Sequence, residues 1–142
     1  MTDPAARRFA PSPLIALAAA AGLLAAPRAD AAPCNAGVCI ASVTVQSCDD
    51  GTMAVDPDPI DVPAPHLMVW NLATPGYSFA RLGIVISGGG FSPDPGISPN
   101  GKRFSVRNAF TDRRRDIKYL VRVVRDSDGK TCAPYDPIIN NH

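Results

Sequence analysis

The fold is decided by one central stretch of the chain, His66-Leu-Met-Val-Trp-Asn-Leu-Ala-Thr-Pro-Gly-Tyr-Ser-Phe-Ala-Arg-Leu-Gly-Ile-Val-Ile-Ser87. Aromatic and β-branched residues dominate both halves of it, and such runs are typical of β-strands. Between the halves, Pro75-Gly76 supplies the fixed φ and the positive φ that a type II turn requires. The stretch therefore predicts two consecutive strands joined by a turn, at the centre of a small sandwich. Trp70, the only tryptophan, lies in mid-strand and is expected to fill the core.

Further strands are predicted on both sides of this stretch by the alternation of apolar and polar residues, which indicates a strand with one buried face. The clearest is Ile117–Arg125, in which one face carries Ile117, Tyr119, Val121 and Val123. Other strands are expected at 40–46, 52–55, 60–62, 102–107 and 135–140. About seven short strands separated by turns predict an all-β fold, an antiparallel Greek-key sandwich.

The first 31 residues have the organisation of a secretory signal peptide. Arg7 and Arg8 precede an apolar run, Leu14–Ala26, and Ala29-Asp-Ala31 has small residues at the positions that a signal peptidase reads. This run is shorter than the roughly 20 apolar residues of a transmembrane helix. We therefore expect residues 32–142 to form one exported domain, periplasmic or secreted, with no stable membrane insertion after signal cleavage. A disordered alanine-rich tail is the alternative.

The cysteines of the chain predict disulfides. All four lie after the signal peptide, at Cys34, Cys39, Cys48 and Cys132. An even number of cysteines in an exported chain implies disulfides, and four cysteines allow three connectivities. We favour Cys34 with Cys39, which closes a short loop before the first strand, and Cys48 with Cys132, which ties the end of that strand to the last hairpin. The alternative is a zinc site of four thiolates, although no C-x-x-C pair is present.

Charge and composition exclude several classes of protein. Three of the 14 Lys and Arg residues and two of the 13 acidic residues precede residue 32, so the predicted domain has 11 of each sign and no net charge. Such a domain has no global field with which to attract nucleic acid, so no nucleic-acid partner is expected. The absence of Glu, together with 15 prolines and 11 glycines, argues against a helical protein.

Residues that commonly carry catalysis are scarce in this sequence. The chain has only two histidines, His66 and His142, and it lacks a G-x-S-x-G elbow. The cysteines are expected to be bridged, which removes them as nucleophiles. We therefore predict a protein that is not an enzyme and that needs no cofactor.

The segment Gly88–Gly101 is predicted to be a long loop, because turn residues occur throughout it and no periodicity is present. Loops of this length are uncommon unless they are functional or disordered. The loop is therefore the first candidate for a contact surface, with Phe91 and Ile97 as its apolar residues. A mobile connection between sheets is the alternative. On the first interpretation, the protein is a binding module for a protein or glycan partner.

A second candidate for binding is the run of Arg113, Arg114 and Arg115. Three neighbouring guanidinium groups can hold a phosphate or a sulfate through charge-assisted hydrogen bonds. The alternative is a solvated turn between strands, because Asp112 and Asp116 bracket the run and cancel much of its field.

A metal site is a further hypothesis. His66 and Met68 lie two residues apart and so share one face of a strand, and an imidazole with a thioether favours copper. Met53 on a neighbouring hairpin is a third ligand in this hypothesis. The function would then be that of a periplasmic copper-binding protein. The alternative is that Met68 is a core residue and His66 a residue of the strand end.

Five short motifs resemble a group of small exported bacterial proteins of uncharacterised function: Cys48-Asp-Asp-Gly51, Trp70 with Thr74-Pro-Gly-Tyr77, Gly83-Ile-Val-Ile86, Tyr119-x-Val121-x-Val123 and Asp136-Pro-Ile-Ile-Asn140. The motifs are turns and strands, and the resemblance extends from residue 43 to residue 140, which is most of the predicted domain. The resemblance implies a cupredoxin-like sandwich, within the broader expectation of a cupredoxin-like or immunoglobulin-like Greek-key fold. A blue-copper protein also has a late Cys followed closely by His and Met, whereas only His142 follows Cys132. The resemblance therefore does not imply a type 1 copper site.

Overall fold

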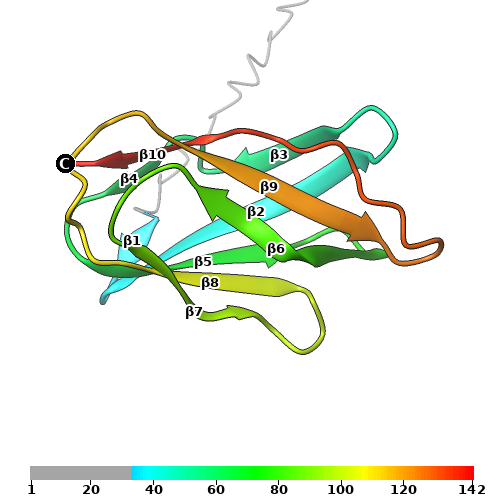
Figure 1. Ribbon diagram of the computed structural model, residues 1–142, viewed down its shortest axis with the longest axis horizontal. Coiled ribbons are helices and arrows are strands. Elements are labelled where there is room, and N and C mark those ends of the chain that lie inside the picture. Colours follow the sequence, from blue (N-terminus) through cyan, green and yellow to red (C-terminus); the bar gives the residue numbers. More distant parts are fainter. Residues whose placement is uncertain (1–32) are drawn as a thin grey trace, which may run out of the picture. The chain divides into compact units, whose positions relative to one another are not determined.

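The computed structural model describes residues 33–142, and the predicted signal peptide at residues 1–31 lies outside the described residues. The described chain folds into strands, turns and irregular segments, without a helix (Figure 1). The ten strands are β1 (Cys34–Asn35), β2 (Val38–Ser47), β3 (Thr52–Asp56), β4 (Ile60–Val62), β5 (His66–Leu72), β6 (Tyr77–Ile86), β7 (Phe91–Ile97), β8 (Arg103–Asn108), β9 (Ile117–Arg125) and β10 (Ile138–Asn141). The predicted all-β sandwich is confirmed, whereas the predicted count of about seven strands was too low.

The strands form two sheets that pack against each other. The first sheet has the order β1-β2-β5-β8-β7, with β3 also paired to β2, and the second has the order β4-β10-β9-β6. The chain leaves the first sheet for β4 before it returns to β5, and this crossover places β5 parallel to β2. In the second sheet, β10 is parallel to β4. Both sheets are therefore mixed: most strand pairs are antiparallel, as predicted, and the pairs β2–β5 and β4–β10 are parallel.

The two sheets enclose one hydrophobic core. Trp70 is fully buried, as predicted, and its Nε1–H donates a hydrogen bond of 3.2 Å to the Tyr119 hydroxyl. The two rings lie 5.4 Å apart between centroids and join β5 of one sheet to β9 of the other. Burial raises the pKa of Tyr119, so its hydroxyl stays neutral. The predicted apolar face of β9 also faces this core, with 0% exposure at Ile117, Tyr119, Val121 and Val123.

The turn in the stretch that decides the fold connects the two sheets. Gly76 has a φ of +82°, as the predicted turn requires. However, β5 pairs with β2 and β8, whereas β6 pairs with β9, so the two strands joined by this turn lie in different sheets. The parity of the apolar residues changes between Phe79 and Leu82, which predicts a bulge. The register of β6 against β9 shifts between Phe79 and Ile84, in agreement with that prediction.

The segment predicted as a long loop, Gly88–Gly101, contains the edge strand β7. This strand pairs with β8, with a register shift between Pro93 and Gly96. Proline has no N–H to donate. It is tolerated in an edge strand because one side of that strand has no neighbouring strand to hydrogen-bond with. The prolines and glycines concealed the strand in the sequence. The prediction of a structureless loop was therefore wrong, and short turns remain on either side of β7.

Both favoured disulfides are present. Cys34 is bonded to Cys39, five positions away, and Cys48 is bonded to Cys132, 84 positions away. No cysteine among residues 33–142 is free, so the alternative of a zinc site with four thiolates is wrong. Two disulfides are typical of a protein in an oxidising compartment. The described part of the chain contains no helix with the length and hydrophobicity that a membrane crossing requires.

Candidate binding face at one end of the sandwich

Connections from different parts of the sequence meet at one end of the sandwich, which we call the end face, formed by residues 35–38, 63–66, 87–91 and 109–116. Strand register brings them together, because Asn108 of β8 lies opposite His66 of β5 on one side and Phe91 of β7 on the other. The Leu67 N–H donates a hydrogen bond of 2.8 Å to the Gly37 carbonyl, which attaches the β1–β2 turn to the same end. In Figure 1 these connections lie at the end that also carries the C-terminus.

Two buried asparagines fix one segment of the end face. Asn108 and Asn141 are fully buried, and Asn108 Nδ2 donates a hydrogen bond of 2.9 Å to Asn141 Oδ1. Asn108 Oδ1 accepts a hydrogen bond of 2.9 Å from the Phe110 N–H, and Asn141 Nδ2 donates one of 2.5 Å to the Asp112 carbonyl. The Asn141 N–H donates to the Arg114 carbonyl over 2.9 Å. The pair therefore holds the backbone from Phe110 to Arg114 at three points.

The run of three glycines allows two connections of the end face to pack closely. Gly90 has a φ of +76°, and a Cβ placed on it would overlap Thr111 Oγ1. A Cβ on Gly88 would lie 3.0 Å from Asp112 Oδ2. Side chains at these positions would force the β6–β7 connection away from the β8–β9 connection. The glycines thus serve close approach between two segments that are far apart in the sequence.

The three arginines of the β8–β9 connection are exposed but differ in their partners. Arg114 forms a two-pronged ion pair with Asp112, with Nη2 at 2.7 Å from Oδ2 and Nε at 2.9 Å from Oδ1. This hydrogen-bonding lowers the pKa of Asp112 to about 2. Arg113 lies over the Phe110 ring, with Cζ 4.3 Å from the centroid. The Arg115 side chain makes no ion pair or hydrogen bond with the described residues. Arg113 and Arg115 therefore retain hydrogen-bond donors for a ligand.

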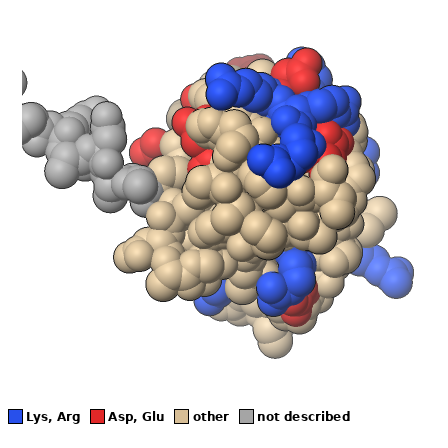
Figure 2. Space-filling model, turned by 90° about the vertical axis from the view of Figure 1, so that its left-hand side faces the viewer, with Lys and Arg blue, Asp and Glu red and all other residues tan. Residues whose placement is uncertain are grey.

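Apolar side chains accompany these cations. Phe91 and Phe110 are half-buried and pack against the core, and each leaves part of its ring at the surface. Figure 2 looks onto this end of the molecule: Lys and Arg gather along its upper edge with Asp among them, and a broad area without charged residues covers the middle. The end face thus combines a cationic edge with uncharged surface.

The structure separates Ile97 from the other predicted binding residues. Ile97 is 36% exposed and lies opposite Phe104, at the far end of β7 from Phe91. A spacing of six residues along a strand corresponds to roughly 20 Å. Phe91 and Arg113–Arg115 therefore belong to connections at the same end of the sandwich, whereas Ile97 lies away from that end.

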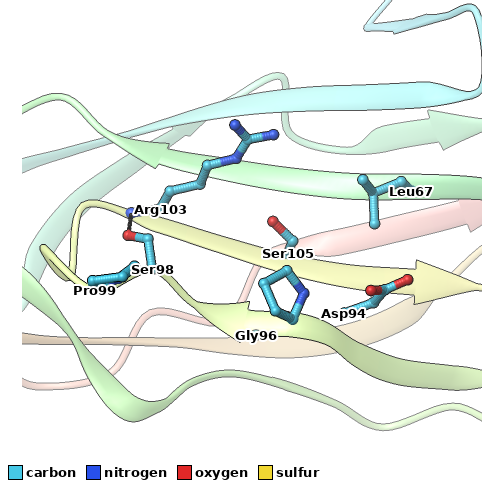
Figure 3. Close-up of a pocket in the computed structure, with 8 residues that line it drawn as sticks. Leu67, Asp94, Gly96, Ser98, Pro99, Arg103 and Ser105 are labelled. Atoms are coloured by element: carbon cyan, nitrogen blue, oxygen red, sulfur yellow. Dashed lines mark hydrogen bonds between the residues drawn. The ribbon is translucent and has the colours of Figure 1, made fainter.

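A shallow hollow lies on the outer face of the first sheet (Figure 3). Its volume is about 240 Å³, and its lining includes Leu67 of β5, Arg103 and Ser105 of β8, and Ser98 and Pro99 of the turn that follows β7. The Arg103 N–H donates a hydrogen bond of 3.1 Å to Ser98 Oγ, which fixes the turn. Pockets for small molecules usually measure about 300–1,000 Å³. The hollow is therefore a weaker candidate than the end face.

The two predicted copper ligands have different surroundings. His66 is half-buried on the end face, and its Nδ1–H donates a hydrogen bond of 2.8 Å to the Ala64 carbonyl. Met68 lies in the core and is 1% exposed. Its sulfur accepts a hydrogen bond of 3.8 Å from Asn108 Nδ2. Copper binding by His66 and Met68 stays a prediction.

The third proposed ligand, Met53, lies far from this pair. Along β2, Val45 is the partner of Met53 and Cys39 is the partner of Met68. Six residues of strand separate these two partners, which corresponds to roughly 20 Å. The structure therefore does not bring Met53 to His66 and Met68.

The two buried asparagines, Asn108 and Asn141, were not among the residues predicted to matter for the site. Asn108 continues the alternation of Phe104 and Val106, and Asn141 continues that of Ile139, so both occupy inward positions. A polar residue at an inward strand position is a usable signal, because buried polar groups are almost always hydrogen-bonded. An asparagine at such a position therefore predicts a hydrogen bond to another segment, which it holds in place.

The chain matches no protein-family model, and no curated protein shows significant sequence similarity to it. The resemblance to small exported bacterial proteins stays a prediction. A function is therefore inferred from the residues of the end face.

Proposed function

We propose that the protein is an exported, non-enzymatic binding module whose end face binds acidic groups of a protein or glycan partner. The observation that carries this proposal is that Arg113 and Arg115 are exposed on a segment that the buried Asn108–Asn141 pair holds in place, with the Phe110 ring under Arg113. Cations on a fixed segment lose less conformational entropy on binding than cations on a mobile loop. The fixed backbone therefore favours recognition over simple solvation of the charges.

The distribution of charge supports this location. Arg113 and Arg115 can each offer a planar fork of donors to a carboxylate or a sulfate. The other basic cluster, at the opposite end of the sandwich, is already neutralised, because Arg125 and Lys130 pair with Asp49 and Asp128. Arg113 and Arg115 of the end face, in contrast, make no ion pair with the described residues, so their charges are not neutralised in this way.

The non-enzymatic role is supported by the states of the reactive groups. The four cysteines form two disulfides, which leaves no thiol nucleophile among the described residues. The Asp112 carboxylate accepts hydrogen bonds from Arg114, and its low pKa keeps it ionised, so it has no proton to donate near neutral pH. Export is supported by the two disulfides and by the organisation of residues 1–31.

Retention on two acidic matrices tests the proposal, one of heparin and one of polyglutamate. We expect the wild-type protein to bind at least one of them at low salt and to elute with rising salt. An Arg113→Ala, Arg115→Ala variant is expected to lose this retention. The matched control is Arg81→Ala, Arg122→Ala, which removes the same charge from the second sheet and should leave retention nearly unchanged.

Two results would contradict the proposal. If both double variants elute equally early, net charge alone determines retention and the end face has no special role. If the wild-type protein passes both matrices without retention, the end face does not bind acidic groups. Far-UV circular dichroism of each variant confirms that the fold is intact.

A further inference from the structure

A disulfide and a histidine lie side by side at the border of the end face, because Cys34 and Cys39 flank its segment 35–38. Cys34 and Cys39 are a cross-strand pair of β1 and β2, and His66 begins the neighbouring strand β5. The two sulfur atoms and one ring nitrogen of His66 all lie within 4.8 Å of one another. The proposed anion-binding role does not use these three groups.

Hydrogen-bonding orients the imidazole for metal binding. A carbonyl oxygen can only accept, so the bond from His66 Nδ1 to the Ala64 carbonyl places the ring proton on Nδ1. Nε2 is then the ring nitrogen that has a lone pair. Histidines that bind metals commonly donate their other ring N–H to a carbonyl in this way, which fixes the ring. His66 therefore has the tautomer and the support of a metal ligand.

The two disulfides of the chain differ in accessibility. Cys34 is half-buried in a two-residue strand that pairs only with β2, and its partner Cys39 is 1% exposed, so one sulfur of this bond can be reached from solvent. Cys48 and Cys132 are 3% and 2% exposed, so neither sulfur of the second bond can be reached. Thiol–disulfide exchange requires a thiolate to reach a sulfur atom, so exposed disulfides react first. A reductant will therefore open the Cys34–Cys39 bond before the Cys48–Cys132 bond.

We propose that Cys34, Cys39 and His66 form a redox-gated site for one Cu(I) ion. A dithiol reductant transfers two electrons and two protons, the S–S bond breaks, two S–H groups form, and the reductant becomes a disulfide. Cu(I) then binds both sulfurs as thiolates, and the thiol protons pass to solvent. Thiolates select soft ions, and three ligands suit Cu(I), whereas structural zinc sites use four. The site is closed to metal while the disulfide is intact.

Cu(I) titration under anaerobic conditions, against a chromogenic Cu(I) chelator, tests this inference. The full exported chain is first treated with a limiting dithiol, and mass spectrometry after alkylation confirms that only Cys34 and Cys39 are reduced. We expect one Cu(I) per reduced chain, with thiolate-to-copper absorption in the ultraviolet, and no uptake by the oxidised chain. His66→Ala should weaken the affinity by about 10-fold or more.

Two control variants separate this site from other sources of copper binding. His142→Ala removes the other histidine, and Met68→Leu removes the nearby thioether; both should leave the affinity of the reduced chain unchanged. The inference is overturned if the oxidised chain binds Cu(I) equally well, if His66→Ala has no effect, or if Zn(II) displaces Cu(I) from the reduced chain. Circular dichroism shows whether each reduced variant keeps its sheet content.

Discussion

Replacing Asn108 with alanine is expected to destabilise the protein strongly. The substitution leaves Asn141 Oδ1 and the Phe110 N–H without their hydrogen-bonding partner. An unsatisfied buried polar group costs about 1–3 kcal/mol. Asn141 is fully buried and will incur most of that cost, whereas the partly buried Phe110 N–H will recover some of it through water. We therefore expect a loss of about 3 kcal/mol in the free energy of unfolding.

This loss corresponds to a large change in melting temperature. Unfolding entropy of about 2.1 cal/mol/K per residue gives about 0.23 kcal/mol/K for the 110 residues of the described domain, so about 3 kcal/mol lowers the melting temperature by about 13 °C. Urea unfolding followed by the fluorescence of Trp70, the single buried tryptophan, measures the free energy directly. The control Asn71→Ala changes an exposed side chain on β5 and should stay within about 0.5 kcal/mol of wild type.

A double-mutant cycle separates the hydrogen-bonding pair from general effects of truncation. Asn108→Ala, Asn141→Ala and the double variant should show a coupling of about 1 kcal/mol or more, because the two amides contact each other. A loss below about 1 kcal/mol in Asn108→Ala, or additivity of the two substitutions, would refute the reasoning. In that case the β8–β9 connection is held by other contacts.

Three further predictions concern an ion pair, a disulfide and an edge strand. The Asp112→Asn variant should melt at a lower temperature than wild type, by a constant amount above about pH 4, and this difference should vanish toward pH 2. The reason is that the lowered pKa of Asp112 stabilises the folded protein only while the carboxylate is ionised. Thermal melts at a series of pH values test this, and a difference that grew in acid would contradict it. Replacing both Cys48 and Cys132 with alanine should cost about 4–5 kcal/mol by the chain-entropy model, since the bond closes a long loop, and a loss below about 1 kcal/mol in urea unfolding would exclude that origin. Deletion of residues 89–99 removes strand β7 and should lower the free energy of unfolding by about 2 kcal/mol or more; an unchanged melting temperature would restore the interpretation of this segment as a loop.

Much of the fold could be predicted because its determinants are local in the sequence. Alternation along Ile117–Arg125 gave the strand and its buried face directly, since side chains on a strand point to alternate sides. Trp70 was placed in the core for the same reason. The disulfides followed from an even number of cysteines and from the positions of Cys48 and Cys132 beside predicted turns.

The remaining features depend on contacts between distant segments. Strand β7 carries Pro93 and Pro95, which break the pattern of a strand and are tolerated only because β7 lies at a sheet edge. The parallel pairing of β2 with β5 depends on the crossover through β4, which no local pattern shows. The end face likewise results from strand register, which places His66 and Phe91 on either side of Asn108.

Mapping of amide chemical shifts during titration with a heparin fragment, and separately with a polyglutamate peptide, tests the central claim most directly. The claim is that the end face holds acidic groups through a fixed cationic edge. We predict that the largest shift changes with at least one ligand fall in residues 87–91 and 109–116, and that they saturate. Changes centred instead on Arg125 and Lys130 at the opposite end, or no saturable change with either ligand, would contradict the account.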